Sequence, residues 1–383
     1  MDFSLSTEQQ MVKDLCRNFA KNEIIPIAEE LDKSGHFPYE VWKKMGNLGI
    51  CGIPFPEECG GWGLDWLSMV IAIEEISRGD ASLGNSLLDS VTLPMNLLCT
   101  FGTEEQKKKW LIPLSTGEKI GAFRLTEAQA GSDTSAIQTR AVLEEDEWVI
   151  NGTKQFITNA GLKHNSLVII AAVTGEGEKG KKKVSNFIIP TGVGGYNFGQ
   201  RYKKMGYRSS ETRELIFDDC RIPKENILGN PEKRITQFLM VLQTSRIGFA
   251  AHSLGLAQAI FDVSLAYAKE REQFGRSISK FQAIRFKLSD MLMEIELARL
   301  MVYKAAWQKD QGENYFATST FAKIFASESA KRCADGGVQI HGAYGLMDEY
   351  PISRYWREVK FEEILEGTSE IQRLNIARRV LKL

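Results

Sequence analysis

The sequence predicts an α+β fold in which helices come first, a β-rich module follows and a helical bundle ends the chain. Two changes of hydrophobic period lead to this prediction. Apolar residues recur with helical spacing from Ser6 to about Leu114, gather in short strand-like runs from about Ile120 to Leu228, and return to helical spacing from Glu232 onward. A chain of 383 residues also exceeds the usual size of one hydrophobic core, so we expect three regions, 1–118, 119–229 and 230–383.

The pattern of apolar residues in the first region predicts helices. The segment "STEQQMVKDLCRNFAKNEI" opens with a Ser-Thr-x-x-Gln pattern that is typical of a helix cap. Met11, Leu15 and Phe19 follow at steps of four, which predicts that they share one face. A second helix start is indicated by "FGTEEQKKKWLIPL".

The second region reads as β structure. Strand-like runs separated by polar, Gly-rich connections are "WVINGTKQFITNA", "SLVIIAAV", "SNFIIP" and "RELIFDDCRI". Asn151-Gly152 lies between apolar flanks in the first of them, and this dipeptide is a strong signal for a two-residue hairpin turn. We therefore expect a hairpin at that point.

The third region should form a helical bundle. A long helix is predicted from about Phe281 to Gln308, because its apolar residues alternate steps of four and three and form one continuous stripe. The residues of this stripe are Ile284, Leu288, Met291, Ile295, Ala298, Val302 and Ala305. The order of helices, β module and bundle excludes a doubly wound sheet.

Composition narrows the class of protein. The net charge of -1 offers no general attraction to nucleic acid or anionic lipid. Six scattered cysteines without CxxC spacing predict free thiols and no metal site. The start "MDFSLSTEQQ" lacks a basic or apolar leader, and no stretch reads as a membrane span, so we expect a cytoplasmic protein.

Hydroxyls and backbone N–H groups cluster in "AFRLTEAQAGSD" and in "FITNAG" about thirty residues later. Thr126, Gly131, Ser132 and Thr158 suit the polar edge of a planar heterocycle, and Phe123 and Phe156 can cover its face. The alternative for either motif alone is a turn with ordinary Ser/Thr capping.

Six segments favour the heterocycle site over ordinary capped turns. In order and spacing, these segments resemble landmarks of the acyl-CoA dehydrogenase family. They are "LTEAQAGSD", "INGTKQFITNAG", "KMGYRSSETRELIFDDCRIPKENILG", "YAKEREQFGRSISKFQAI", "VQIHGAYGLMDEYPISRYWRE" and "LEGTSEIQRLNIARR". The resemblance implies a helical N-terminal domain, a middle β-barrel, a C-terminal four-helix bundle, a homotetramer, and one FAD per subunit between barrel and bundle.

The resemblance also implies which residues bind FAD. The isoalloxazine end would be held by Phe123, Leu125, Thr126, Ser132, Phe156 and Thr158, and the adenosine end would lie near Thr368 and Glu370. A neighbouring subunit would contribute Arg271, Gln273, Phe274, Gln339 and Gly342. The planar fork of Arg271 suits a pyrophosphate, although a solvated arginine is the alternative in "KEREQ".

Glu366 falls at the position of the catalytic base in short- and medium-chain members of the family. The Glu-Gly pair permits a sharp turn that can aim the carboxylate away from a helix. The resemblance implies that Glu366 removes the α-proton of an acyl-CoA thioester while the β-hydrogen leaves as hydride to flavin N5. Some relatives carry the base at another position, which is Ser245 in this chain, and a serine cannot serve as this base. The alternative for Glu366 is a solvated charge or a helix cap.

Ser132 and Arg246 match positions that contact the substrate in the family.

Asp89 matches a residue that lines the far end of the acyl cavity, where it could be a second acid or base for a polar or alicyclic acyl group. The alternative is a helix cap or a solvent-facing carboxylate.

Arg124 occupies a position where the family commonly has a small residue, and it could point outward or alter the flavin environment. Gly84, at the position of an arginine in glutaryl-type members, argues against glutaryl-CoA, and Leu365 leaves room for a branched or cyclic acyl group.

The leading functional prediction is an FAD-dependent acyl-CoA dehydrogenase that acts on short-chain or alicyclic acyl-CoA, forms an enoyl-CoA and passes electrons to an electron-transferring flavoprotein. Two alternatives remain open from the sequence. One is a flavin oxidase or monooxygenase of the same fold, and the other is a non-enzymatic flavoprotein that binds a partner or DNA.

Overall fold

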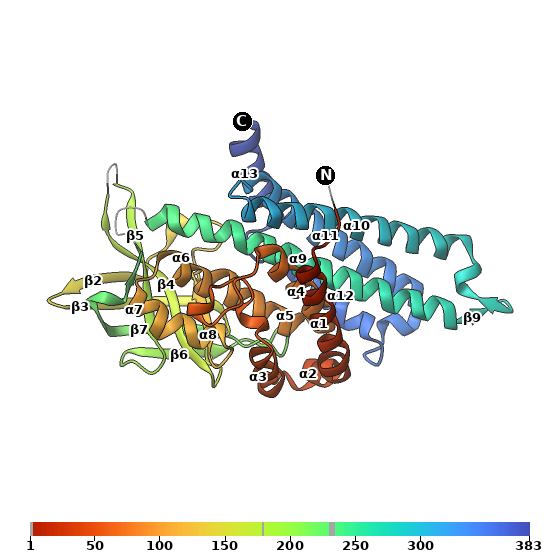
Figure 1. The fold of residues 1–383 in the computed structure, drawn as a ribbon, viewed down its shortest axis with the longest axis horizontal. Coiled ribbons are helices and arrows are strands. Elements are labelled where there is room, and N and C mark those ends of the chain that lie inside the picture. Colours follow the sequence, from red (N-terminus) through yellow and green to blue (C-terminus); the bar gives the residue numbers. More distant parts are fainter. Residues whose placement is uncertain (1–2, 178–179, 230–233) are drawn as a thin grey trace.

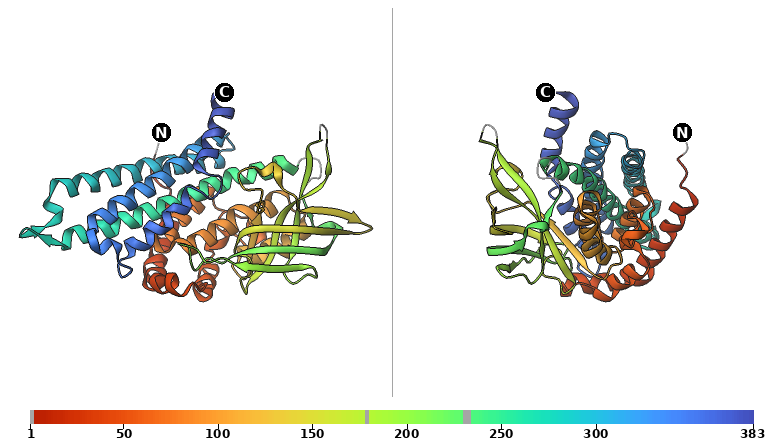
Figure 2. Two further views of the ribbon diagram at one scale, coloured as in Figure 1. Left: turned by 180° about the vertical axis from the view of Figure 1, so that it is seen from behind. Right: turned by 60° about the vertical axis from the view of Figure 1, so that its left-hand side comes forward.

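The computed structural model describes residues 3–177, 180–229 and 234–383. A β-sheet lies at one end of the elongated molecule, and long helices run from it to the other end (Figure 1). The sheet stands to one side of the helical part, as the turned views show (Figure 2). The predicted order of helices, β module and helical bundle is confirmed.

The N-terminal helices begin with a capping box, in which the Ser6 hydroxyl accepts from Gln9 N–H and the Gln9 side chain accepts from Ser6 N–H. The helices are α1 (Thr7–Phe19), α2 (Ala28–Ser34), α3 (Tyr39–Asn47), α4 (Trp66–Gly79), α5 (Ala81–Ser90), α6 (Asn96–Phe101), α7 (Glu104–Gln106) and α8 (Ile112–Ser115). The predicted face of α1 is wrong at Met11, which is 66% exposed, because Val12, Cys16 and Phe19 form the buried stripe instead.

The β module contains eight strands among the residues described. They are β1 (Ile120–Arg124), β2 (Arg140–Glu144), β3 (Glu147–Thr158), β4 (Asn165–Glu176), β5 (Lys182–Pro190), β6 (Tyr196–Arg201), β7 (Thr212–Pro223) and β8 (Ile227–Leu228). The path β6-β7-β3-β2-β4-β5-β8, with β1 parallel to β4, does not return to its first strand. The predicted barrel is therefore not closed, because the edge strand β6 pairs with β7 alone and β8 pairs with β5 through two residues.

Asn151-Gly152 is not the predicted hairpin turn. Strand β3 continues through it, and β2 turns into β3 at residues 145–146, where Glu145 has φ +52°. Gly152 instead sits beside a register shift in the pairing of β3 with β7. Its φ is +143°, and a Cβ would lie 2.7 Å from Thr139 Cα, so the glycine permits a close approach of two strands.

The C-terminal helices are α9 (Arg234–Glu270), α10 (Gln282–Asp310), α11 (Phe316–His341), α12 (Pro351–Glu362) and α13 (Ser369–Ile376), and the short hairpin of β9 (Glu272–Gln273) and β10 (Arg276–Ser277) separates α9 from α10. The predicted stripe of α10 is buried from Leu288 to Ala305, whereas Ile284 is half-buried. One segment, Met240–Glu270 of α9, has the length and composition of a membrane span, but 67% of its apolar window is buried, as in a core helix of a bundle.

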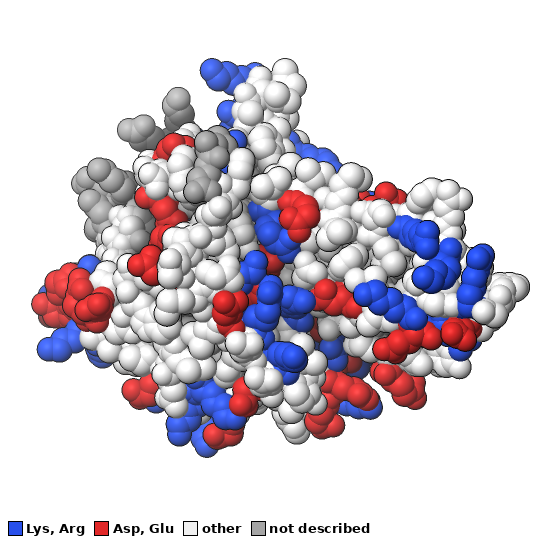
Figure 3. All heavy atoms as spheres, turned by 45° about the vertical axis from the view of Figure 1, so that its right-hand side comes forward, with Lys and Arg blue, Asp and Glu red and all other residues white. Residues whose placement is uncertain are grey.

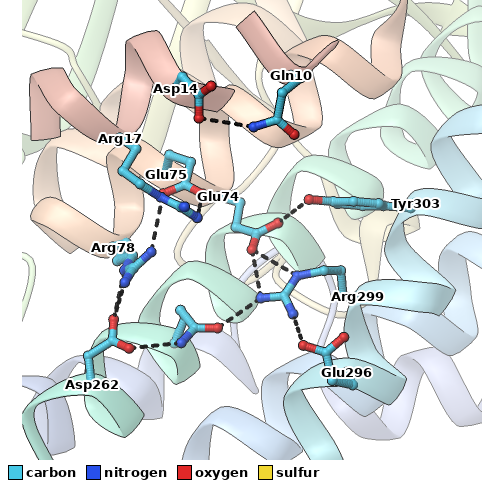
Figure 4. A network of polar contacts seen from close by, with 11 residues as sticks. Gln10, Asp14, Arg17, Glu74, Glu75, Arg78, Asp262, Glu296, Arg299 and Tyr303 are labelled. Atoms are coloured by element: carbon cyan, nitrogen blue, oxygen red, sulfur yellow. Dashed lines mark hydrogen bonds and ion pairs between the residues drawn. The ribbon is translucent and has the colours of Figure 1, made fainter. Parts of the chain in front are cut away.

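Ion pairs of two buried glutamates fix α4 between α1 and the bundle (Figure 4). Glu74 accepts from Arg299 Nη2 at 2.9 Å and from the Tyr303 hydroxyl at 2.7 Å, and both of these residues come from α10. The neighbouring Glu75 accepts from Arg17 of α1 at 2.7 Å. Since α5 follows α4 after a single residue, this network also sets the position of α5.

The outer surface carries both signs of charge. On the face shown in Figure 3, Lys and Arg side chains and Asp and Glu side chains lie close to one another in the centre and along the lower edge, with white areas between them. This face therefore presents mixed charges rather than a patch of one sign.

Candidate active site

A left-handed turn sets the direction of Glu366. Helix α12 ends at Glu362, and Glu366 and Gly367 then adopt φ values of +54° and +88°. The next helix, α13, starts where Thr368 Oγ1 accepts from Ile371 N–H at 3.3 Å. Two consecutive left-handed residues lift the Glu366 side chain out of helical register, as the Glu-Gly pair predicts.

Side chains from three helices hold this turn in place. Lys323 Nζ of α11 donates to the carbonyl of Gly367 at 3.0 Å, and Gln372 Nε2 of α13 donates to the carbonyl of Glu366 at 2.9 Å. The hydroxyl of Ser245 in α9 donates to Glu366 Oε2 at 2.8 Å. The carboxylate and its backbone are thus both fixed, and one carboxylate oxygen makes no hydrogen bond among the residues described.

Two buried cations, Arg246 and Lys323, lie near the Glu366 carboxylate and interact with its negative charge. Burial lowers the pKa of Arg246 to about 10 and that of Lys323 to about 8, while the charge of Glu366 opposes both shifts. Arg246 Nε is buried and has no hydrogen-bond partner among the described residues. A negatively charged ligand group would therefore be favoured beside Arg246.

Asp89 is buried in the last turn of α5, with 2% of its surface exposed. Its Oδ1 lies 2.6 Å from Arg124 Nη1 at the end of β1, and Arg124 Nη2 donates to Thr158 Oγ1 at 2.6 Å. Arg124 thus points inward, and Asp89 is neither a helix cap nor a solvent-facing carboxylate. Its other oxygen, Oδ2, is buried without a hydrogen-bond partner within the part of the chain described.

The electrostatics of Asp89 combine opposing effects. Burial raises the pKa of its carboxyl to about 7, the guanidinium of Arg124 opposes this rise, and the charge of Glu366 adds to it. Asp89 and Glu366 therefore influence one another, although the ion pair to Arg124 involves Asp89 alone. A carboxyl with a pKa near neutrality can gain or lose a proton under ordinary conditions.

An aromatic surface is exposed at the end of β3. Phe156 has φ +60° and is 56% exposed, and its ring centroid lies 5.1 Å from that of Tyr202. Thr158 ends the strand beside it, and Thr126 and Ser132 lie on the loop after β1. Phe123, by contrast, is buried in the hydrophobic core, so of the two predicted aromatic residues it is Phe156 that presents a ring to the surface.

A buried ion pair shapes the loop after β1. Glu127 accepts from Gln138 N–H at 2.6 Å, from Thr139 N–H at 3.0 Å and from Lys154 Nζ at 2.7 Å. Lys154 also donates to the carbonyl of Leu125 at 3.0 Å. Sequence reasoning missed this pair, because the neighbours of Lys154 in β3, Thr153 and Gln155, are polar and do not signal a buried lysine.

The binding residues that the family resemblance attributes to a neighbouring subunit gather at the far end of the bundle, whereas Glu370 lies in the first turn of α13, next to the Glu366 turn. Arg271, Gln273 and Phe274 lie in and beside the β9–β10 hairpin, which Figure 1 shows at the tip opposite the sheet. Gln339 and Gly342 lie at the C-terminal end of α11. This end is close to the hairpin, because Arg271 lies 5.4 Å from the ring centroid of Tyr344, two residues after Gly342. Phe274 is 92% exposed.

The predicted site residues therefore form two groups. One group surrounds the sheet end and the Glu366 turn, and the other follows the end of α9. Ser245 and Arg271 are 26 residues apart along α9 and its end, which corresponds to about 40 Å at 1.5 Å per residue. Sequence reasoning missed Lys323 and Gln372, although a lysine on the apolar face of "FAKIFA" signals a buried cation.

The residues at the sheet end fit a flavin. The exposed ring of Phe156 offers a flat apolar surface, and Thr126, Ser132 and Thr158 offer hydroxyls beside it. Asp89 Oδ2 and Arg246 Nε are buried without hydrogen-bond partners in the described part of the chain, and both residues interact with the charge of Glu366. No group of His, Cys, Asp or Glu suited to a metal ion occurs within the described residues.

Comparison with known proteins identifies the family. Its models describe the N-terminal, middle and C-terminal domains of acyl-CoA dehydrogenase, and they match residues 6–118, 122–220 and 235–381, each within one of the three predicted regions. The predicted boundary at 229/230 adjoins residues 230–233, which lie outside the described part of the chain.

Two curated relatives match over the full length of both chains. The probable acyl-CoA dehydrogenase YngJ of Bacillus subtilis is 51% identical, and the short-chain specific acyl-CoA dehydrogenase of Clostridium acetobutylicum is 45% identical. Among solved structures, the butyryl-CoA dehydrogenase of Megasphaera elsdenii is 40% identical with a TM-score of 0.96. A chain in a structure of the electron transferring flavoprotein of Acidaminococcus fermentans is 44% identical, also with a TM-score of 0.96. Each of these two matches covers 100% of this chain and 100% of the other chain.

These matches span the whole chain and agree with the order of its elements, so the chain belongs to the acyl-CoA dehydrogenase family of FAD-dependent oxidoreductases.

Proposed function

We propose that this protein oxidises a short-chain or alicyclic acyl-CoA to the enoyl-CoA, with Glu366 as the base that removes the α-proton. The observation that carries this proposal is the left-handed turn at Glu366, which aims a carboxylate that is fixed through one oxygen by Ser245. FAD, when bound, supplies the acceptor for the β-hydride. The chain's own residues then have to orient the thioester and accept one proton.

The surroundings of Glu366 suit this task. The second carboxylate oxygen has no hydrogen-bond partner among the described residues, so it can accept a proton. The backbone N–H of Glu366 also makes no hydrogen bond there, which leaves it available to a thioester oxygen that gains negative charge. Arg246 and Lys323 add positive charge on the same side, and Arg246 together with Ser132 is our proposal for contacts with the substrate.

Asp89 is our candidate for a second acid or base in the acyl pocket. Arg124 holds Oδ1, Oδ2 has no hydrogen-bond partner among the described residues, and burial raises the pKa of this carboxyl to about 7. A ring substrate would use such a group if a hydrogen beyond the α- and β-positions had to be removed. A short linear acyl group would leave Asp89 with a role in the shape and polarity of the pocket only.

The experiment that tests this proposal is anaerobic mixing of the purified protein with a panel of acyl-CoA thioesters while flavin absorbance is recorded. The panel contains linear, branched, cyclohexane-carboxyl and cyclohexene-carboxyl thioesters, and Asp89→Asn is the matched variant. If linear thioesters bleach the flavin rapidly in both wild type and Asp89→Asn, Asp89 has only a structural role. Bleaching by cyclic thioesters that Asp89→Asn loses supports the second acid or base. No bleaching by any thioester would contradict the proposed activity.

Two features support the proposal of a homotetramer in which neighbouring chains share each FAD. The far group of binding residues, including Arg271 and Phe274, lies at the opposite end of the bundle from Phe156 and Thr158. A second stripe of α10 also lies exposed on the bundle surface, with helical spacing, at Phe286, Met293, Leu297, Leu300 and Trp307. A second copy of the chain could supply the missing group and cover the stripe.

Hybrid assemblies test this sharing. Glu366→Gln and Arg271→Ala chains are co-expressed with different tags and purified as mixed oligomers. If FAD is shared, one type of site in the hybrid has both Glu366 and Arg271, so turnover returns that neither parent shows. Equal inactivity of the hybrid and both parents would contradict a shared site.

An electron-transferring flavoprotein is the proposed electron acceptor, because a chain similar to this one occurs in the solved structure of such a protein from Acidaminococcus fermentans. Reduction of a purified electron-transferring flavoprotein, compared with oxygen uptake under the same conditions, distinguishes this acceptor from O₂. The cytoplasm is the proposed compartment, since all six cysteines are free and five of them are buried.

A further inference from the structure

A buried carboxyl outside the proposed chemistry lies four residues before Glu366. Glu362 is the last residue of α12, and its side chain is completely buried. It contacts the hydroxyl of Tyr207, Nδ1 of His252 at 3.0 Å and Oγ of Ser253 at 2.5 Å. These residues come from the loop between β6 and β7 and from α9, so the cluster joins the β module to the bundle.

The hydrogen bonds of His252 require one hydrogen between its Nδ1 and Oε1 of Glu362. Nε2 of His252 lies 2.9 Å from the carbonyl of Ala81, and because a carbonyl only accepts, Nε2 must carry hydrogen. In a neutral imidazole Nδ1 then accepts, and the protonated carboxyl of Glu362 is the donor that faces it. Burial raises the pKa of Glu362 and lowers that of His252 to about 4, which favours the same neutral pair.

The cluster and the base are held by the same face of α9. Ser245 contacts Glu366, and His252, seven residues or two helical turns further along, contacts Glu362. Glu362 and Glu366 are therefore attached to two points on one face of the same helix. Tyr207, which has φ +50°, stacks on Phe361 at a centroid distance of 4.5 Å and closes the cluster from the side of the sheet.

We propose that Glu362, in its neutral protonated form, is a positioning residue that sets the place of Glu366 against α9 and the β module. This inference rests on the proposed role of Glu366 as the base. The neutral carboxyl donates to His252 and accepts from the hydroxyls of Tyr207 and Ser253, without placing a net charge beside Glu366 in the protein interior. The start of the turn is thereby fixed at Glu362, as its end is fixed by Lys323 and Gln372.

Three variants test the geometric part of the inference by steady-state kinetics. Glu362→Gln keeps a donor that faces His252 and an acceptor that faces Ser253, so we expect kcat within about threefold of wild type, since a neutral amide replaces a neutral acid. Glu362→Ala removes all three contacts, and we expect kcat to fall about 10- to 100-fold with little change in KM, because the base is displaced from its productive position. Tyr207→Phe removes one hydroxyl and keeps the ring, and a smaller loss of kcat is expected.

Glu358 provides the matched control, because it is also a buried carboxyl of α12 and lies one turn further from Glu366. Glu358→Ala should lower stability without the selective loss of kcat. A folded Glu362→Ala protein with wild-type kcat would overturn the inference. If Glu362→Ala does not fold, unchanged kcat in Tyr207→Phe overturns it instead.

The protonation state is measured without turnover. The infrared spectrum of wild type minus that of Glu362→Gln near neutral pH should contain the C=O stretching band of a protonated carboxyl. A carboxylate band in its place would overturn the inference. This result is independent of Glu366: if Glu366→Gln kept full turnover while the protonated band was present, the proposed base would be wrong and the neutral state of Glu362 would still be correct.

Discussion

Glu366 and Asp89 are two carboxyl groups near the same proposed substrate region, and the protein holds them in different ways. Glu366 lies on a left-handed turn, and a neutral hydroxyl fixes one of its oxygens. Asp89 lies inside a regular helix, and a guanidinium fixes one of its oxygens. The backbone aims the first carboxyl and an ion pair aims the second, so the two sites should respond differently when a partner is removed.

The largest expected effect is the loss of Arg124. Arg124→Met leaves Asp89 buried without its cation, and removing one member of a buried ion pair typically costs about 3–5 kcal/mol of unfolding free energy. Urea unfolding of wild type and variant at slightly alkaline pH measures this loss. The double variant Arg124→Met/Asp89→Asn should recover a large part of it, because the uncompensated charge is then absent.

An exposed arginine serves as the control for this comparison. Arg221 forms ion pairs on the surface of β7 with Glu144 and Asp219, so Arg221→Met should cost less than about 1 kcal/mol. Equal unfolding free energies of Arg124→Met and Arg221→Met would show that Arg124 does not anchor Asp89.

A smaller effect is expected at the partner of Glu366. Ser245→Ala removes a hydrogen bond to a charged group, which is worth about 1.5–3 kcal/mol, so kcat should fall roughly 10- to 100-fold while the protein stays folded. Ser264→Ala is the control, since Ser264 is equally buried in α9 and its hydroxyl has no hydrogen-bond partner among the described residues. If both variants have wild-type kcat, the hydroxyl of Ser245 does not position the base.

A further effect is the pH dependence that Asp89 adds to stability. Its pKa is raised from 3.8 to about 7 in the folded protein, so the folded state holds a proton that the unfolded chain has released. The stability contributed in this way is fully present below pH 3.8 and is lost as pH rises through about 7. Unfolding free energies between about pH 5 and about pH 8 should therefore fall more for wild type than for Asp89→Asn. Parallel curves for the two proteins would contradict a raised pKa.

The sequence predicts those features that depend on neighbouring residues. The cap at Ser6 and the turn at Glu366 follow from a few adjacent residue types, and the buried stripe of α10 follows from its periodicity. The hairpin expected at Asn151-Gly152 failed because a longer strand pairing uses the glycine for close approach to Thr139. Local turn preference was outweighed there by the sheet.

Contacts between distant segments could not be predicted. Arg124 was recognised as unusual for its position, but its partner is 35 residues earlier in another region, and nothing in either segment specifies the pair. The cluster of Glu362, His252 and Tyr207 likewise joins three segments that meet only in the folded chain. The resemblance to a family gave the positions of expected site residues, whereas the charges that surround them required the structure.

The central claim is that Glu366 removes the substrate's α-proton, and single-turnover flavin reduction tests it most directly. FAD-loaded wild type and Glu366→Gln are mixed anaerobically with a thioester that reduces the wild-type flavin, and binding of the same thioester is measured separately. We expect the variant to bind FAD and thioester as wild type does and to reduce its flavin about 10²- to 10⁴-fold more slowly, the usual contribution of a general base. Flavin reduction at the wild-type rate in Glu366→Gln would contradict the account.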